Sequence, residues 1–356
     1  MTIKNILNNL FKSSSNEVLG LDIGTLAIKG ICLDQSGGHY TITGGAKVDI
    51  SQETPSRRVE QMARSIEAIC RCVSVCGYKS NRVVCAVDAP DAAVRGFTLP
   101  PMPPGEIGYA VLQEAEHVSP SEMENTVVDY QLVGDYREGQ EIRGMLAAAS
   151  TDAIGVKCQL AVKAALKAVL VDTDTMALIN CFSVFGNLSD NQTTAIIYVT
   201  NSCTNFIILS AYCLPFIRNI SCRGGKILSA ISSDLGLSEQ EVMLSLFGQD
   251  YLSTGFNAVR DSFFNTIGSL VSEIGETIRY YQTYERDSQI DRILLCGDFT
   301  MIEGVEQFFD NSLAEPVERW NPVDNIEIAP SVKNRDLLYQ NGPGMAVALG
   351  LSMRTF

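Results

Sequence analysis

Histidine is scarce in this chain, basic residues are outnumbered, and no long apolar run is present. The 356 residues include two histidines, and 27 lysines plus arginines stand against 41 acidic residues, a formal charge of −14. Nonspecific nucleic-acid binding needs a basic surface that displaces counterions, so we exclude nucleic acid as a partner. No apolar run approaches the roughly 20 residues of a membrane span, and we expect neither a membrane helix nor a signal peptide.

The eleven cysteines form no CxxC pair, so the usual ligand spacing of a zinc site is missing. Cys70, Cys72 and Cys76 are the one local group, and Cys72 and Cys76 would share a helix face. A packed helix is the simpler interpretation, because free cysteine behaves as a small hydrophobe; a metal or redox role is the alternative. The odd number of scattered thiols fits a reducing cytoplasm.

The first residues of the chain form an amphipathic pattern. Apolar side chains in residues 2–12 fall on one helical face, and residues 13–16 read as a polar linker. We expect a short helix there that lies on a membrane surface, docks on a partner or folds back onto its own domain.

Hydrophobic periodicity divides the rest of the chain into two similar series of elements. Strands are predicted at residues 18–24, 27–33, 40–50, 82–87, 92–99, 126–133, 142–150, 169–172, 193–199, 205–210, 212–220 and 291–296. Helices are predicted at residues 57–76, 106–118, 151–166, 173–185, 226–235, 256–285 and 344–353, and after the capping residue Ser238. Each series opens with three strands and continues with helices, which predicts an α/β fold with mixed sheets.

The first hairpin carries residues that suit a phosphate group. Gly24 would let backbone N–H groups approach a phosphate closely, and the Thr25 hydroxyl could hydrogen-bond it. Asp22 could hold a metal-bound water, and Lys29 could supply positive charge. The alternative is an ordinary hairpin, because short Asp-x-Gly segments are common.

The order and spacing of several segments resemble the actin-like superfamily and, within it, the PilM family of type IV pilus assembly proteins. Leu19 to Lys29 is similar to the family's first phosphate segment, and residues 293–297 are similar to its adenosine segment. The other similar segments are residues 114–116, 127–130, 146–149, 171–172, 218–225, 235–241 and 273–281. The resemblance implies an actin-like (ribonuclease H-like) two-lobed fold, with mixed sheets and an inserted strand-helix-strand-strand subdomain like that of FtsA.

The resemblance also implies a division of the chain and a nucleotide site. The predicted parts are an N-terminal helix and linker (1–16), a first lobe (17–91 and 167–190, with helix 343–356), the inserted subdomain (92–166) and a second lobe (191–342). ATP and Mg²⁺ would bind between the lobes, with Asp22 at the metal. The implied nucleotide-binding residues are Asp22, Gly24, Thr25, Lys29, Thr200, Thr204, Gly224, Gly225, Glu273, Gly297 and Asp298.

This sequence departs from the family pattern at that site. The second phosphate segment reads Tyr198-Val-Thr200 where the family usually has Asp-Ile-Gly, and Asp298 stands where a second glycine is expected. Leu26 and Ala27 replace hydroxyl-bearing residues in the first turn. Phosphoryl transfer depends on positioning and charge neutralisation, so we expect weak ATP binding at most, weak or absent hydrolysis, and no catalytic residue.

For partners, the resemblance implies a cytoplasmic scaffold on the inner face of the inner membrane. It would grip the N-terminal tail of a PilN-like membrane protein and link the pilus motor or platform to the periplasmic alignment complex. Independently of the resemblance, the amphipathic pattern of residues 2–12 would allow peripheral membrane contact. An extended tail would lie in an apolar groove between the first and the inserted subdomain. The predicted groove residues are Val84, Val87, Phe97, Leu99, Tyr109, Leu112 and Met145.

Three other functions stay open at this point. An actin-like ATPase or kinase would need an intact second phosphate segment, which Tyr198 and Thr200 argue against. An FtsA-like polymerising protein would have a basic amphipathic tail at its end, whereas the amphipathic segment here is at the front. The cytoplasmic domain of a type II secretion protein would precede a membrane span, and no such span is present in this sequence.

Overall fold

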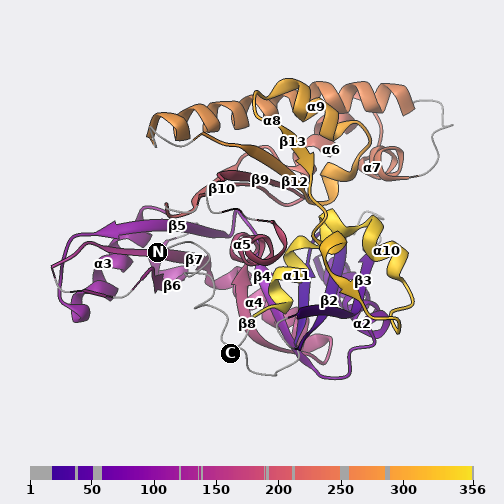
Figure 1. The fold of residues 1–356 in the computed structure, drawn as a ribbon. Helices are drawn as coiled ribbons and strands as arrows, with labels where there is room; N and C mark the ends of the chain where they lie inside the picture. Colours follow the sequence, from indigo (N-terminus) through magenta and orange to yellow (C-terminus); the bar gives the residue numbers. More distant parts are fainter. Residues whose placement is uncertain are drawn as a thin grey trace.

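The computed structural model shows two lobes, with a smaller sheet projecting to one side (Figure 1). It describes residues 18–354 except 37–38, 51–57, 120–121, 135, 138, 188, 190–191, 211–212, 249–255 and 285–288. The predicted helix and linker at residues 1–16, with the membrane-facing segment 2–12, therefore lie outside the described residues.

The first lobe is built on a six-stranded sheet in the order β14-β3-β2-β1-β4-β8. Its strands are β1 (Leu19–Ile23), β2 (Ala27–Ser36), β3 (His39–Asp49), β4 (Arg82–Val87), β8 (Lys167–Thr173) and β14 (Glu327–Ile328). β1, β2 and β3 are antiparallel neighbours, whereas β1, β4 and β8 run parallel, so the sheet is mixed as expected. β1 is buried along nearly its whole length, which explains why it reads as an apolar run rather than an alternating strand.

Helices cover both faces of this sheet. α2 (Arg58–Cys76) and α4 (Thr151–Lys163) pack on one face, and α5 (Asp174–Phe185) and α11 (Ala346–Ser352) pack on the other. Cys72 and Cys76 are buried between α2 and the hairpin of β2 and β3, where their thiols contact backbone carbonyls. Their burial supports the packed-helix interpretation for these two cysteines, whereas Cys70 is exposed.

The second lobe is built on a five-stranded sheet in the order β11-β10-β9-β12-β13. Its strands are β9 (Thr194–Val199), β10 (Thr204–Leu209), β11 (Phe216–Ile220), β12 (Arg292–Cys296) and β13 (Val317–Arg319). Its outer face packs on α6 (Gly224–Leu235), α7 (Glu239–Phe247), α8 (Phe256–Tyr284) and α9 (Val305–Ser312). Its inner face shares one apolar core with α5 and α11, so these two helices lie between the sheets (Figure 1).

Local signals account for two element boundaries in this lobe. α7 begins with the predicted capping box, in which Ser238 and Glu241 exchange side-chain and backbone hydrogen bonds of 2.8 and 3.2 Å. The predicted strand 212–220 begins only at Phe216, because Pro215 has no N–H to donate to a neighbouring strand.

The inserted subdomain has the predicted strand-helix-strand-strand order. Its elements are β5 (Ala92–Leu99), α3 (Pro104–Glu116), β6 (Thr126–Leu132) and β7 (Ile142–Ser150), with the strands in the order β5-β7-β6. α3 covers one face of the sheet and buries Phe97 and Leu146 beneath Val111. β5 also touches the second lobe, since a Cβ built on Gly96 would lie 3.0 Å from Leu214 Cβ.

Short elements between residues 298 and 345 join the two lobes, and the sequence patterns did not predict them. These elements are η2 (Asp298–Met301), η3 (Pro322–Asn325), α10 (Arg335–Gln340) and η4 (Gly342–Met345). A further unpredicted turn, η1 (Met123–Asn125), lies in the inserted subdomain. β14 pairs with β3, so part of the range 191–342 joins the first sheet rather than the second. Among the described helices, none combines the length and the hydropathy that a membrane crossing requires.

Candidate functional site

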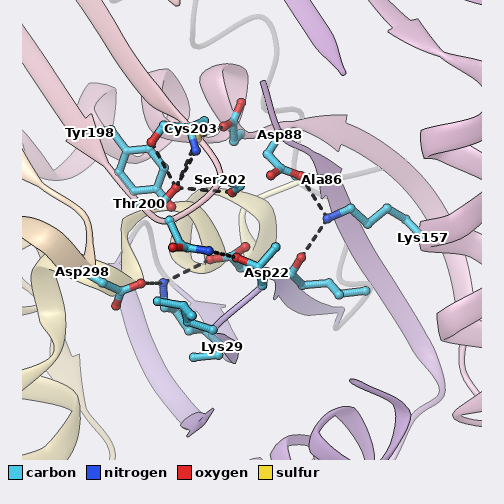
Figure 2. A pocket seen from close by; sticks show the side chains of 17 residues that line it. Asp22, Lys29, Ala86, Asp88, Lys157, Tyr198, Thr200, Ser202, Cys203 and Asp298 are labelled. Atoms are coloured by element: carbon cyan, nitrogen blue, oxygen red, sulfur yellow. Dashed lines mark hydrogen bonds and ion pairs between the residues drawn. The ribbon is translucent and has the colours of Figure 1, made fainter. Parts of the chain in front are cut away.

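The turn between β1 and β2 forms one wall of a cleft between the lobes, which we call the central cleft. Gly24 N–H donates to the Ala27 carbonyl at 3.2 Å and closes this turn. Asp22 and Lys29 are direct cross-strand partners, so both side chains point to the same side of the sheet. Their charged atoms are 3.5 Å apart, and Figure 2 shows both side chains facing the cleft.

The turn between β9 and β10 forms the opposite wall. Thr200 N–H donates to the Cys203 carbonyl at 2.9 Å, and the N–H groups of Gly224 and Gly225 donate to the carbonyls of Thr200 and Asn201. The start of α6 is therefore fixed to this turn rather than open to a ligand. The Asn201 side-chain amide donates to Thr25 Oγ1 at 2.8 Å, which joins the two turns across the cleft.

Asp298 closes the cleft from the end of β12. Lys29 Nζ donates to Asp298 Oδ2 at 2.7 Å, and Lys47 Nζ lies 3.4 Å from Oδ1 of the same carboxylate. Burial alone would raise the pKa of Asp298, but Lys29 and Lys47 outweigh burial and hold it below its usual value. Burial alone would lower the pKa of Lys29, but Asp298 and Asp22 together raise it. Both groups are therefore charged at neutral pH.

A second ion pair lies at the inner end of the cleft. Lys157 Nζ on α4 donates to the Ile23 carbonyl at 2.7 Å and to Asp88 Oδ1 at 3.2 Å. Burial would raise the pKa of Asp88, but the charge of Lys157 and a hydrogen bond from Ser202 keep it lowered. Asp88 precedes β5 and Lys157 follows β7 along the chain, so this pair joins the two segments that flank the inserted subdomain and lies beside the first turn.

A third carboxyl group is held against the second turn. Asp174 Oδ2 accepts from Asn205 Nδ2 at 2.9 Å and from the Cys203 thiol at 3.2 Å. Burial, with a smaller contribution from the charge of Asp88, raises the pKa of Asp174 to about 6. Burial likewise raises the pKa of Asp22, although Lys29 and Lys157 oppose it.

As the cleft stands in the structure, the space between the two turns is too small for a magnesium–triphosphate. The cavity there has a volume of about 30 Å³, which is room for roughly one water molecule. The positive charge of Lys29 is taken by Asp298 and Asp22, and that of Lys157 by Asp88. Among the described residues, no group of three His, Cys, Asp or Glu side chains could hold a metal ion.

A larger side pocket of about 710 Å³ opens beyond Asp298. It lies between α7, the residues that follow β12, and the end of β3, and its walls include Met243, Phe247, Ile302 and Lys47. This volume is within the range of small-molecule sites. Asp298 borders both spaces, together with Leu26 and Ala27 of the first turn.

Some of the predicted nucleotide residues line the central cleft, and the others lie outside it. Those that line the central cleft are Asp22, Gly24, Thr25, Lys29, Thr200 and Asp298. Gly224 and Gly225 bond the second turn through their backbone, and Gly297 takes a φ of +98° beneath it. Thr204 is buried in β10, and Glu273 on α8 bonds Ser221 instead.

Several cleft residues were missed by the sequence analysis. Asp88, Lys157, Asp174, Asn201 and Ser202 all line the central cleft. Only Asp88 and Asp174 could have been found from the sequence. Each is a carboxylate that directly follows an apolar strand pattern, and the ends of such strands are where a binding site is expected. Lys157 gave none, since a lysine in a helix is usually exposed.

The predicted groove residues do not come together on one surface. Val84 and Val87 are buried in the first sheet, and Phe97 and Leu99 are buried beneath α3. Tyr109 and Leu112 lie on the outer side of α3, with 69% and 47% of their surface exposed. Met145 is half-buried on the sheet face that points away from α3, because its neighbours Gly144 and Leu146 face that helix.

Comparison with known proteins connects this fold to one family. Residues 20–356 match the sequence model of the family described as type IV pilus assembly protein PilM. A solved PilM–PilN type IV pilus biogenesis complex is 21% identical with a TM-score of 0.80, covering 95% of this chain and 98% of that one. The ethanolamine utilization protein EutJ from Carboxydothermus hydrogenoformans is 12% identical with a TM-score of 0.52, covering 99% and 95%. A diol dehydratase-reactivating factor is 10% identical with a TM-score of 0.52, covering 94% and 99%. The chain therefore has the actin-like fold and belongs to the PilM family of type IV pilus assembly proteins.

Proposed function

We propose that this protein is a pilus assembly scaffold that captures the N-terminal tail of a PilN-like inner-membrane protein. It would sit on the cytoplasmic face of that membrane through this partner and link the pilus motor or platform to the periplasmic alignment complex. The observation that carries the proposal is the likeness, over 95% of this chain, to a PilM solved together with PilN.

The inserted subdomain offers a surface for such a tail. One face of its sheet is covered by α3, whereas the other carries the half-buried side chains of Met145, Ala147 and Ala149 beside Val127, which is 50% exposed. A tail that lies on this face could place alternate apolar side chains between these residues, as extended peptides do on other domains. We therefore place the tail on the sheet face that points away from α3.

The closed central cleft supports a scaffold rather than an ATPase. Two lysines that would meet phosphate groups are already paired with carboxylates of the chain, and the remaining cavity holds about 30 Å³. Phosphoryl transfer requires those charges to be free for the transferred group. We infer a degenerate nucleotide site, with hydrolysis weak or absent and with tail binding that needs no nucleotide.

Calorimetry with a synthetic PilN-like tail tests this function. The Met145→Glu variant should lose at least about tenfold in affinity, because a charge would then be buried against the tail. Tyr109→Glu is the matched control, since Tyr109 lies on the opposite side of the subdomain and is exposed. Full tail affinity in the Met145 variant would exclude this face, and no tail binding by the unaltered protein would exclude the function.

A further inference from the structure

Several polar contacts join the lobes across the central cleft, and two of them end on Asp298. The carboxylate of Asp298 accepts from Lys29 at 2.7 Å and lies 3.4 Å from Lys47, while Asn201 donates to Thr25 at 2.8 Å. Lys29 and Lys47 belong to the first sheet, whereas Asp298 follows β12 of the second. The side chains of Lys29 and Asp298 are only 3% and 14% exposed.

The position of Asp298 is fixed by the backbone around it. Gly297 adopts a φ of +98°, and a Cβ at this residue would lie 2.3 Å from the Val199 carbonyl, so the chain can turn here only with glycine. Gly297 N–H also donates to the Pro343 carbonyl at 2.9 Å. A Cβ on Gly344 would lie 2.6 Å from Asp298 Oδ1, so the carboxylate occupies space that only a glycine leaves free.

The chemistry of this arrangement matches that of a bound phosphate group. A buried lysine that faces a cleft between two phosphate-type turns would ordinarily meet phosphate oxygens, and here it meets carboxylate oxygens instead. A contact of 2.7 Å is the length of a charge-assisted hydrogen bond. A polyphosphate entering the cleft would have to displace this carboxylate and would then face the negative charges of Asp22 and Asp298.

We propose that Asp298 is a resident counter-ion that takes the place of a nucleotide phosphate, so that it joins the two lobes without a nucleotide and excludes triphosphates from the central cleft. The side pocket, which Asp298 also lines, stays open beside the central cleft. The proposal does not depend on tail binding, which concerns a different surface of the molecule.

Hydrogen–deuterium exchange of the full chain without nucleotide tests the contact between the lobes. The Asp298→Asn variant removes the charge and keeps the shape, and we expect the amides of residues 24–26 and 201–203 to exchange about tenfold faster or more. Lys47→Met is the second variant, because it weakens the same contact without leaving Lys29 unpaired. Asp261→Asn, on the exposed side of α8, is the matched control and should exchange like the unaltered protein.

Calorimetry with Mg–ATP tests the exclusion of triphosphates. Removal of the Asp298 charge should tighten Mg–ATP binding by about tenfold or more, and Lys47→Met should not tighten it, because that variant only removes positive charge. Equal exchange and equal ATP affinity in Asp298→Asn and Asp261→Asn would overturn the proposal. Micromolar ATP binding by the unaltered protein would overturn it as well. Tail binding measured on the same samples reports separately on the proposed scaffold function.

Discussion

The ion pair between Lys157 and Asp88 gives the most quantitative prediction of the structure. Lys157→Met keeps the apolar stem of the side chain but removes its charge and three donors. The Ile23 carbonyl and the Asp88 carboxylate then lose a donor at 2.7 and 3.2 Å. The Lys157 side chain is 12% exposed and that of Asp88 is 28% exposed, so water replaces the lost contacts only in part.

The expected loss of stability follows from these exposures. Removing one partner of a fully buried ion pair costs about 3–5 kcal/mol, because the other charge is left unpaired. Asp88 keeps some contact with water and its bond from Ser202, so we expect a loss of about 2–3 kcal/mol in the free energy of unfolding. The pKa of Asp88 is lowered in the folded protein, so its contribution is present at neutral pH and is lost as the pH falls below about 4. The difference between the variant and the unaltered protein should therefore shrink in acid.

Urea unfolding at neutral pH measures this loss. Lys333→Met is the matched control, because Lys333 is exposed, and it should change the free energy of unfolding by less than about 0.5 kcal/mol. The double variant Asp88→Asn with Lys157→Met should recover part of the loss, since the unpaired charge is gone. A Lys157 variant as stable as the Lys333 control would refute this account of the cleft.

Two further predictions concern packing and pH. Gly350→Ala should destabilise the protein by about 1–3 kcal/mol, because the new Cβ would lie 1.9 Å from the Ala177 carbonyl where α11 crosses α5. Gly155→Ala on α4 should instead stabilise the protein by up to about 1 kcal/mol, because the added Cβ meets no described atom within 4 Å. Thermal unfolding of both variants and the unaltered protein measures these changes in stability. Asp174 has a folded pKa of about 6, above its unfolded value, so its contribution to stability is present below about pH 4 and is lost as the pH rises through 6. Asp174→Asn should therefore gain about 2–3 kcal/mol relative to the unaltered protein between about pH 4 and pH 7, as measured by urea unfolding at each pH.

Local patterns predicted most of the helices and strands, and the family resemblance that rested on their order is confirmed. The first hairpin shows why local patterns are sufficient there. The positions of Asp22, Gly24 and Lys29 are set by the turn and by the register of the two strands. The roles of the predicted site residues and the limits of the domains stay predictions.

Several placements could not be predicted from the sequence, for reasons that lie in the tertiary structure. Val84 and Val87 lie in a strand that is buried on both faces, and a continuous apolar run does not distinguish a groove wall from a core. Lys157 is far from Asp88 and Ile23 in the sequence. It can donate to them only because the fold packs α4 beside the first turn. In the sequence, Asp298 predicts only a weakened nucleotide site, whereas the structure shows that its carboxylate contacts Lys29 and Lys47.

Tail binding with and without nucleotide tests the central claim most directly. Calorimetry of the unaltered protein with the PilN-like tail, in buffer and in about 1 mM Mg–ATP, should give affinities that agree within about twofold, because the cleft is closed by the chain's own side chains. A tail affinity that changes by about tenfold or more when Mg–ATP is added would contradict the claim, because it would show that nucleotide and tail are coupled through an open cleft.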